Sequence, residues 1–360
     1  MPAKPKSAAA KRPGEKPLPS GAKSEKSSPT SASRQREESR NAKAQAKLWN
    51  QWDRLHGKSA NNGGKRTVRE KPAKREPYLV SIINQKGGTG KTTTTVNLGA
   101  ALAYLGFSTL LVDLDPQGHT TIGLGIDPDS FLESMAEVMR TPKKPVSDIT
   151  MFTYIPKLYL APANIHLASV AEQIYARIFR EGILYQALQG LPYDFILIDC
   201  PPSLGVLTIN ALYACDLIII PCQISRYSLD GLADLLTTVE HVKALKPQDL
   251  FKGDLFRILL TMYDRRNRVT NQYVLEEIRP YWKKTFQTLI MKNEALNQSQ
   301  IAQKAVFDFD PESSGSLDYH NLAVEFLQLY HRRTGVPVEE RWLNTDIAPN
   351  LSYETEVTNS

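Results

Sequence analysis

Short apolar runs alternate with longer amphipathic stretches from residue 77 onward. Seven runs predict strands near residues 78–84, 109–113, 157–161, 195–199, 217–221, 256–262 and 286–290. The run 195–199 is apolar throughout, which is typical of a strand buried on both faces. Helices are predicted near residues 92–105, 131–140, 168–189, 205–214, 229–245, 270–281 and 317–333. Strands that alternate with helices indicate an α/β fold with a mostly parallel, doubly wound sheet.

The last predicted helix has a clear apolar stripe and a clear end. Leu322, Phe326, Leu329 and Tyr330 recur at helical spacing, and Gly335 follows as a stop signal. We expect these apolar residues to belong to the core rather than to a functional site.

A glycine-rich segment joins the first predicted strand to the first predicted helix. Glycines let backbone N–H groups wrap phosphate oxygens, and the helix N-terminus adds partial positive charge. In such a loop Lys91 would reach the β- and γ-phosphates of a nucleotide, and the Thr92 hydroxyl would bind Mg²⁺. The predicted nucleotide-binding residues are Lys86, Gly87, Gly88, Thr89, Gly90, Lys91, Thr92 and Thr93.

The loop departs from the usual P-loop pattern at its start. Gln85 stands where G-x-x-x-x-G-K-[ST] requires glycine, and a second lysine, Lys86, follows it. Lys91 already serves the phosphates of its own nucleotide. Lys86 could therefore point across an interface, toward nucleotide held by a second subunit.

Two further apolar runs end in aspartate. Asp113 and Asp115 follow the run 110–112, and Asp199 follows the run 195–198. Carboxylates at strand ends place negative charge at the rim of the loop, where Mg²⁺ and an attacking water could be arranged. Each aspartate could instead cap a turn, where this residue is common. Three such segments in this order favour the nucleotide site.

Together these segments resemble the ParA/MinD family of deviant Walker A ATPases, and its ParA branch in particular. The resemblance covers about residues 77–333, including the segments 220–231 and 260–264. It implies a P-loop NTPase fold that binds ATP and Mg²⁺. It also implies that Lys86 completes the partner's site in an ATP-bound homodimer, that Asp115 positions or activates the hydrolytic water, and that Asp199 holds Mg²⁺ through water. Hydrolysis is expected to be slow until a ParB-like or other adaptor protein stimulates it.

The resemblance further implies non-specific DNA binding by a cytoplasmic, nucleoid-associated protein that segregates chromosomes or plasmids. Members often carry Arg-Asn-x-Arg-Leu after the seventh strand, but Ala295 replaces the second arginine here. Arg265, Arg266 and Arg268 could compensate by neutralising phosphates, or they could form a solvated loop.

The loop that carries these arginines has a second possible role. Its residues Met262 and Tyr263, together with Lys292, are candidates for the adenine pocket.

Related functions remain as alternatives. A ParA-like ATPase could instead position a protein cargo, such as a chemoreceptor cluster or the division machinery. A MinD-like regulator would associate with membrane through a basic amphipathic C-terminal helix. The C-terminus here is neither basic nor periodic, and no run approaches 18 apolar residues, so no membrane contact is expected.

Charge and composition divide the chain into three parts. Residues 1–76 contain 20 of the 44 Lys and Arg and 7 of the 38 Asp and Glu, which gives +13 there and −7 in the rest. This arm is rich in Pro, Ser and Ala and has few large apolar residues, so we expect it to be largely disordered. Residues 77–335 form the expected ATPase domain. Residues 336–360 form an acidic, polar tail that we expect to be loosely held.

One segment of the arm has a helical apolar stripe. Within residues 42–56, Leu48, Trp49, Trp52 and Leu55 fall at i, i+1, i+4 and i+7. The stripe could dock on the body or on a partner, or it could be an incidental frayed segment.

Cysteine and histidine give no sign of a metal centre. Cys200, Cys215 and Cys222 lie in apolar segments, are odd in number and lack C-x-x-C spacing, so we expect reduced core thiols. The six histidines show no metal-ligand spacing.

Overall fold

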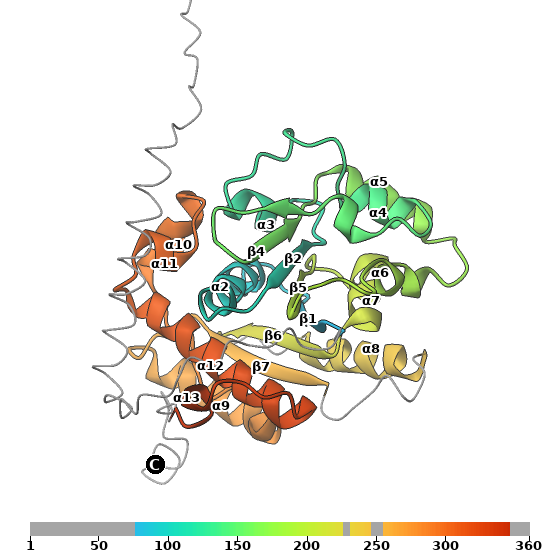
Figure 1. Cartoon of the computed structure of the whole chain (residues 1–360). Helices are drawn as coiled ribbons and strands as arrows, with labels where there is room; N and C mark the ends of the chain where they lie inside the picture. The colour runs from blue at the N-terminus through green and yellow to red at the C-terminus, as the bar shows by residue number, and fades with distance from the viewer. Residues whose placement is uncertain (1–75, 226–230, 246–254, 346–360) are drawn as a thin grey trace, which may run out of the picture. The chain divides into compact units, whose positions relative to one another are not determined.

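The computed structural model describes residues 76–225, 231–245 and 255–345, which form a seven-stranded sheet covered by helices (Figure 1). The strand order is β3-β4-β2-β5-β1-β6-β7, and only β3 pairs antiparallel. The strands are β1 (Tyr78–Ile82), β2 (Thr109–Asp113), β3 (Met151–Phe152), β4 (Leu158–Ala161), β5 (Phe195–Asp199), β6 (Leu217–Gln223) and β7 (Phe256–Thr261). All residues of β1, β2 and β5 are buried, as expected of parallel strands covered on both faces. The predicted α/β fold of the P-loop NTPase type is confirmed. The arm lies outside the described residues.

Helices cover both faces of the sheet and enclose two apolar clusters. One face carries α2 (Lys91–Tyr104), α11 (Val306–Phe309), α12 (Ser314–Thr334) and α13 (Glu340–Leu343). The other carries α4 (Met135–Arg140), α5 (His166–Ile174), α6 (Ile183–Ala187), α7 (Val206–Ala214) and α8 (Leu232–Leu245). The helix α9 (Arg268–Ile278) contributes Val274, Leu275 and Ile278 to this second cluster. The sheet is therefore doubly wound.

The predicted stripe of α12 packs as expected. Leu322, Phe326 and Leu329 are buried, and Tyr330 packs against the same cluster. The ring of Phe195 on β5 lies 5.3 Å from that of Phe326 and 5.0 Å from that of Tyr330, in edge-on contacts that aromatic pairs prefer. Gly335 caps the helix in the left-handed conformation, with φ of 69°.

The prediction of a strand over 286–290 is wrong, although the segment runs beside β7. Isolated parallel bridges at Thr285 and Met291 flank it. Between them, the Glu325 carboxylate of α12 accepts hydrogen bonds from the N–H groups of Gln287 and Thr288, at 2.8 and 2.9 Å. A buried carboxylate from the covering helix thus takes the donors that a regular ladder would use.

The long helix predicted over 168–189 is broken in three. The helix α5 ends at Ile174, a 3₁₀ turn, η2, spans Arg180–Gly182, and α6 follows. Phe179 adopts the left-handed conformation, with φ of 58°. The side-chain amide of buried Asn210 donates to the Arg180 carbonyl at 2.7 Å and accepts from the Leu184 N–H at 3.0 Å. This long-range contact stabilises the break, which no local pattern indicates.

The described part of the C-terminal tail packs against the body, contrary to our expectation. Trp342 on α13 is 2% exposed, and the Gln328 side chain donates to the carbonyls of Trp342 and Thr345, both at 2.9 Å. Residues 346–360 lie outside the described residues. No helix that the structure describes is long and apolar enough to cross a membrane.

Candidate nucleotide site

The glycine-rich loop connects the carboxyl end of central strand β1 to the first turn of α2. Gly88 and Gly90 have φ of 72° and 91°, which residues with a Cβ rarely adopt. Gly90 is also the residue before the first helical residue, Lys91. The loop therefore places backbone N–H groups and the helix N-terminus at one point, as phosphate binding requires.

Lys91 folds back on the loop. Its Nζ donates to the carbonyl of Lys86 at 3.1 Å, and its side chain is mostly buried. Burial lowers the pKa of this ammonium, while Asp199, Cys200 and Asp115 act in the opposite direction. Lys91 thus fills the concave side of the loop where a phosphate would lie, and its charge is held near two carboxylates.

Lys86 is held by its own chain at the entrance of the loop. Its Nζ donates to Ser225 Oγ at 3.1 Å, just beyond the end of β6. Two neighbouring side chains make similar contacts, since Asn84 donates to the Pro221 carbonyl at 2.7 Å and Gln85 to the Gly231 carbonyl at 3.4 Å. The loop entrance is therefore tied to the segment that follows β6.

Hydroxyl groups converge on Asp199 at the end of β5. Thr92 and Thr120 both donate to Asp199 Oδ2 at 2.7 Å, and Thr95 donates to Oδ1 at 3.3 Å. Burial raises the pKa of Asp199, and the hydrogen bonds from Thr92 and Thr120 oppose the rise.

These oxygen donors suit Mg²⁺, which binds through a few hydroxyl or carboxylate oxygens, water and substrate phosphates rather than a protein cage. Among the described residues no group of three or more His, Cys, Asp or Glu could form such a cage. Thr92 and Asp199 therefore fit the predicted metal role.

The two aspartates after β2 have different surroundings. Asp113 is fully buried and accepts from both the N–H and the hydroxyl of Thr121, at 2.8 and 2.7 Å. Burial and the charge of Asp199 raise the pKa of Asp113 to about 7. Asp115 instead lines a cavity, and its carboxylate accepts from the Gln117 N–H at 2.9 Å. Asp113 thus braces the turn, and Asp115 is the carboxylate available to a ligand.

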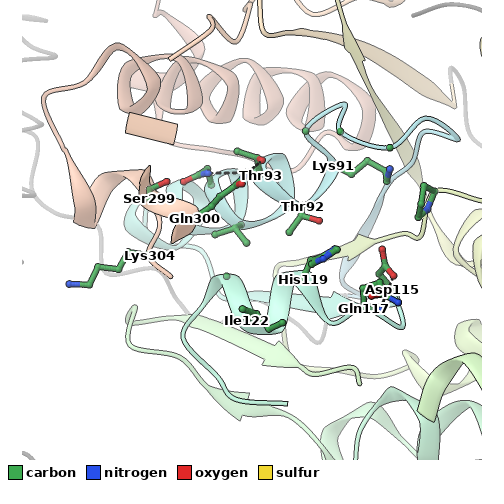
Figure 2. A pocket seen from close by; sticks show the side chains of 17 residues that line it. Lys91, Thr92, Thr93, Asp115, Gln117, His119, Ile122, Ser299, Gln300 and Lys304 are labelled. Atoms are coloured by element: carbon green, nitrogen blue, oxygen red, sulfur yellow. Dashed lines mark hydrogen bonds between the residues drawn. The ribbon is translucent and has the colours of Figure 1, made fainter. Parts of the chain in front are cut away.

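A cavity of about 440 Å³ opens beside the loop (Figure 2). Figure 2 shows Asp115, Gln117 and His119 on one side of the Lys91–Thr93 turn, and Ser299, Gln300 and Lys304 on the other. Gln300 on α10 (Glu294–Ile301) donates to the Thr93 hydroxyl. Gln117, His119, Ser299, Gln300 and Lys304 were not predicted, because Ser299, Gln300 and Lys304 reach the loop from about 200 residues away in sequence. His119 and Gln117 could have been suspected, since they directly follow Asp115.

The predicted adenine residues lie together but outside the lining of this cavity. The Lys292 N–H donates to the Tyr263 carbonyl at 2.9 Å, and Tyr263 is buried. Met262 has φ of 54°, unusual for a residue with a side chain. The β7 end nevertheless touches the loop, since Thr261 Oγ1 donates to the Thr89 carbonyl at 2.9 Å.

The candidate DNA residues differ in availability. Arg266 forms a two-pronged contact with Asp264, at 2.9 and 2.7 Å, which lowers the pKa of that carboxyl to about 2. Arg265 and Arg268 are exposed. Ala295 lies in the first turn of α10, partly buried, with its N–H bonded to the Asn293 side chain.

Comparisons with known proteins agree with this site. A family model described as an AAA domain matches residues 78–251. Sporulation initiation inhibitor protein Soj of Bacillus subtilis (strain 168) is 43% identical over 251 residues, 69% of this chain and 97% of that protein. Chromosome partitioning protein ParA of Myxococcus xanthus (strain DK1622) is 39% identical over 254 residues, 69% of this chain and 88% of that protein.

A solved structure extends the comparison. Cobyrinic acid a,c-diamide synthase of Mycobacterium smegmatis, with bound ATP analog and magnesium, is 32% identical with a TM-score of 0.60, covering 72% of this chain and 97% of that one. The loop, the two aspartate turns and these similarities lead to one conclusion. The chain belongs to the ParA/MinD family of deviant Walker A ATPases, in its ParA branch.

Proposed function

We propose that the protein is an ATP-driven switch that dimerises on ATP, grips DNA without sequence preference, and is reset by hydrolysis. The observation that carries the proposal is the meeting of the loop, Asp199 and Asp115 at one edge of the sheet. The partition proteins among its relatives support the use of this switch in moving chromosomes or plasmids. Such a protein would work in the cytoplasm, associated with the nucleoid.

The loop residues would bind the nucleotide and the metal. Lys91 would leave the Lys86 carbonyl and turn its ammonium to the β- and γ-phosphates. Thr92 would coordinate Mg²⁺ directly and Asp199 through water, which explains why the two side chains already lie 2.7 Å apart. Bound Mg²⁺ would neutralise charge on the phosphates. Asp115, on the cavity wall, would orient the attacking water.

Lys86 would complete the site of the second subunit. For that it must release Ser225 and extend across the interface. A partner lysine beside the phosphates adds positive charge where negative charge develops in the reaction. ATP would then hold the dimer together, and an adaptor protein of the ParB type would accelerate hydrolysis by completing this arrangement.

The DNA surface would come from the dimer, from the arm, or from both. Arg265 and Arg268 are the exposed candidates on the body, whereas Arg266 would first have to leave Asp264. The net charge of +13 on residues 1–76 suits phosphates as well.

Binding of the full-length protein to random duplex DNA, with ATP and with ADP across a salt series, tests the proposal. Tight binding only with ATP is the expected result, with a slope of log K against log salt of about −0.9 for each phosphate neutralised. Arg265→Ala/Arg268→Ala should reduce that slope if the body makes the contact. Equal binding with both nucleotides would assign DNA contact to the arm alone. No binding in either state would refute the DNA part of the proposal.

A further inference from the structure

One turn on the surface exposes an unusual concentration of apolar side chains. In the turn formed by residues 175–180, Tyr175 is 64% exposed, Ile178 85% and Phe179 79%. Other exposed large apolar residues, such as Val269 on α9, stand apart from one another in the sequence, and scattered examples are normal on protein surfaces. Three within five residues make an apolar tip that a partner could cover.

The fold holds this turn rigidly in place. Arg180 donates to the Tyr175 carbonyl at 2.6 Å and stacks over the Tyr175 ring at 4.8 Å. Arg177 donates to the Arg140 carbonyl at 2.6 Å, and buried Asn210 holds the Arg180 carbonyl. Phe179 is kept in the left-handed conformation by this framework. The apolar side chains therefore stay outside even though the backbone is fixed.

The arm enters the body close to the same turn. The Glu76 carboxylate, at the start of the described residues, accepts from the Gly190 N–H at 3.4 Å. Gly190 follows α6, a helix of five residues that spans about 8 Å, and η2 joins the other end of α6 to the turn. A chain of 75 residues thus begins within a short helix length of the exposed tip.

We propose that residues 42–56 of the chain's own arm dock on the 175–180 turn. The segment offers the apolar stripe Leu48, Trp49, Trp52 and Leu55, which needs an apolar surface of this size. The charges agree as well. The segment carries Lys43, Lys47 and Arg54 against Asp53, while Glu172 and Glu181 flank the turn.

The linker and the tether make the contact feasible. Residues 57–76 form a connection of 20 residues, with three glycines, whose average span as a flexible chain is about 25 Å. A flexible tether of this kind gives an effective concentration on the order of 1 mM. A segment with an intrinsic Kd of about 0.1 mM would therefore be docked about nine-tenths of the time. Docking would leave the basic residues 1–41 to other contacts.

Limited trypsin digestion of the full-length protein, followed by mass spectrometry, tests the proposal. Cleavage after Lys47 and Arg54 should be about tenfold slower than cleavage after Lys23 and Lys26, which lie in the same arm outside the segment. Ile178→Ser/Phe179→Ser should remove this protection. Val269→Ser, on a residue of equal exposure on α9, should leave it unchanged.

A second variant and a dilution series guard the interpretation. Trp49→Ala/Trp52→Ala should also remove the protection, and it cannot do so by unfolding the turn. Equal cleavage at all four sites in the wild type, or protection that survives the substitutions in the turn, would overturn the proposal. Protection that disappears on dilution would overturn it too, because it would place the segment on a second copy of the chain. None of these outcomes depends on ATP or DNA binding.

Discussion

Ser225→Ala should strengthen the ATP-dependent dimer. In the structure the Lys86 ammonium donates to Ser225 Oγ at 3.1 Å, and in the proposed dimer this bond must break. A hydrogen bond of this kind contributes about 1 kcal/mol net, or about a fivefold change in an equilibrium constant. Each dimer breaks two such bonds, so the dimer Kd should fall up to about 25-fold.

The measurement is the dimer Kd by sedimentation in ATP, made in an Asp115→Ala background so that hydrolysis does not drain the complex. Ser225→Asp should have the opposite effect, because an ion pair would hold Lys86 more tightly, and high salt should reduce the difference. In a Lys86→Ala background Ser225→Ala should change nothing. A dimer that weakens with Ser225→Ala would refute the reasoning, since Ser225 would then stabilise the dimer rather than the separate subunit. A wild type that fails to dimerise on ATP would refute the proposed switch itself.

Three further predictions concern the site and the fold. Asp115→Ala should lower the single-turnover hydrolysis rate about 10²–10⁴-fold with unchanged ATP affinity, and an equal loss of ATP binding would contradict a role in orienting water. Burial raises the pKa of Asp318 to about 7, so the folded chain keeps a proton that the unfolded chain releases near pH 4, and stability falls as pH rises between those values. Asp318→Asn, which retains an acceptor for the Met291 N–H, should therefore be more stable than the wild type by about 1–4 kcal/mol at pH 8 and by little at pH 4.5, as urea denaturation would report. Gly99→Ala in α2 should cost about 1–3 kcal/mol in the same assay, because its Cβ would lie 2.5 Å from Leu111 Cδ2, and an unchanged midpoint would mean that Leu111 can move aside.

The sequence alone was sufficient for the sheet and the loop, because both depend on local signals. A buried parallel strand needs a short apolar run, and a phosphate loop needs glycines between a strand and a helix. Lys91, Thr92 and Asp199 could be assigned together because the carboxyl ends of parallel strands meet at one edge. The resemblance to the ParA family rested on the same segments, and the comparisons confirmed it.

Contacts between distant residues decided the rest. Glu325 removes the predicted strand over 286–290 by taking its backbone donors, and Asn210 helps break the helix predicted over 168–189. Gln300 reaches Thr93 across 207 positions, and Ser225 holds Lys86 across 139. No periodicity encodes such pairs, because a side chain that caps a distant backbone group leaves the pattern around both partners unchanged. The sequence therefore determined where the nucleotide would bind, and the tertiary structure decided which side chains surround it and which hold Lys86 back.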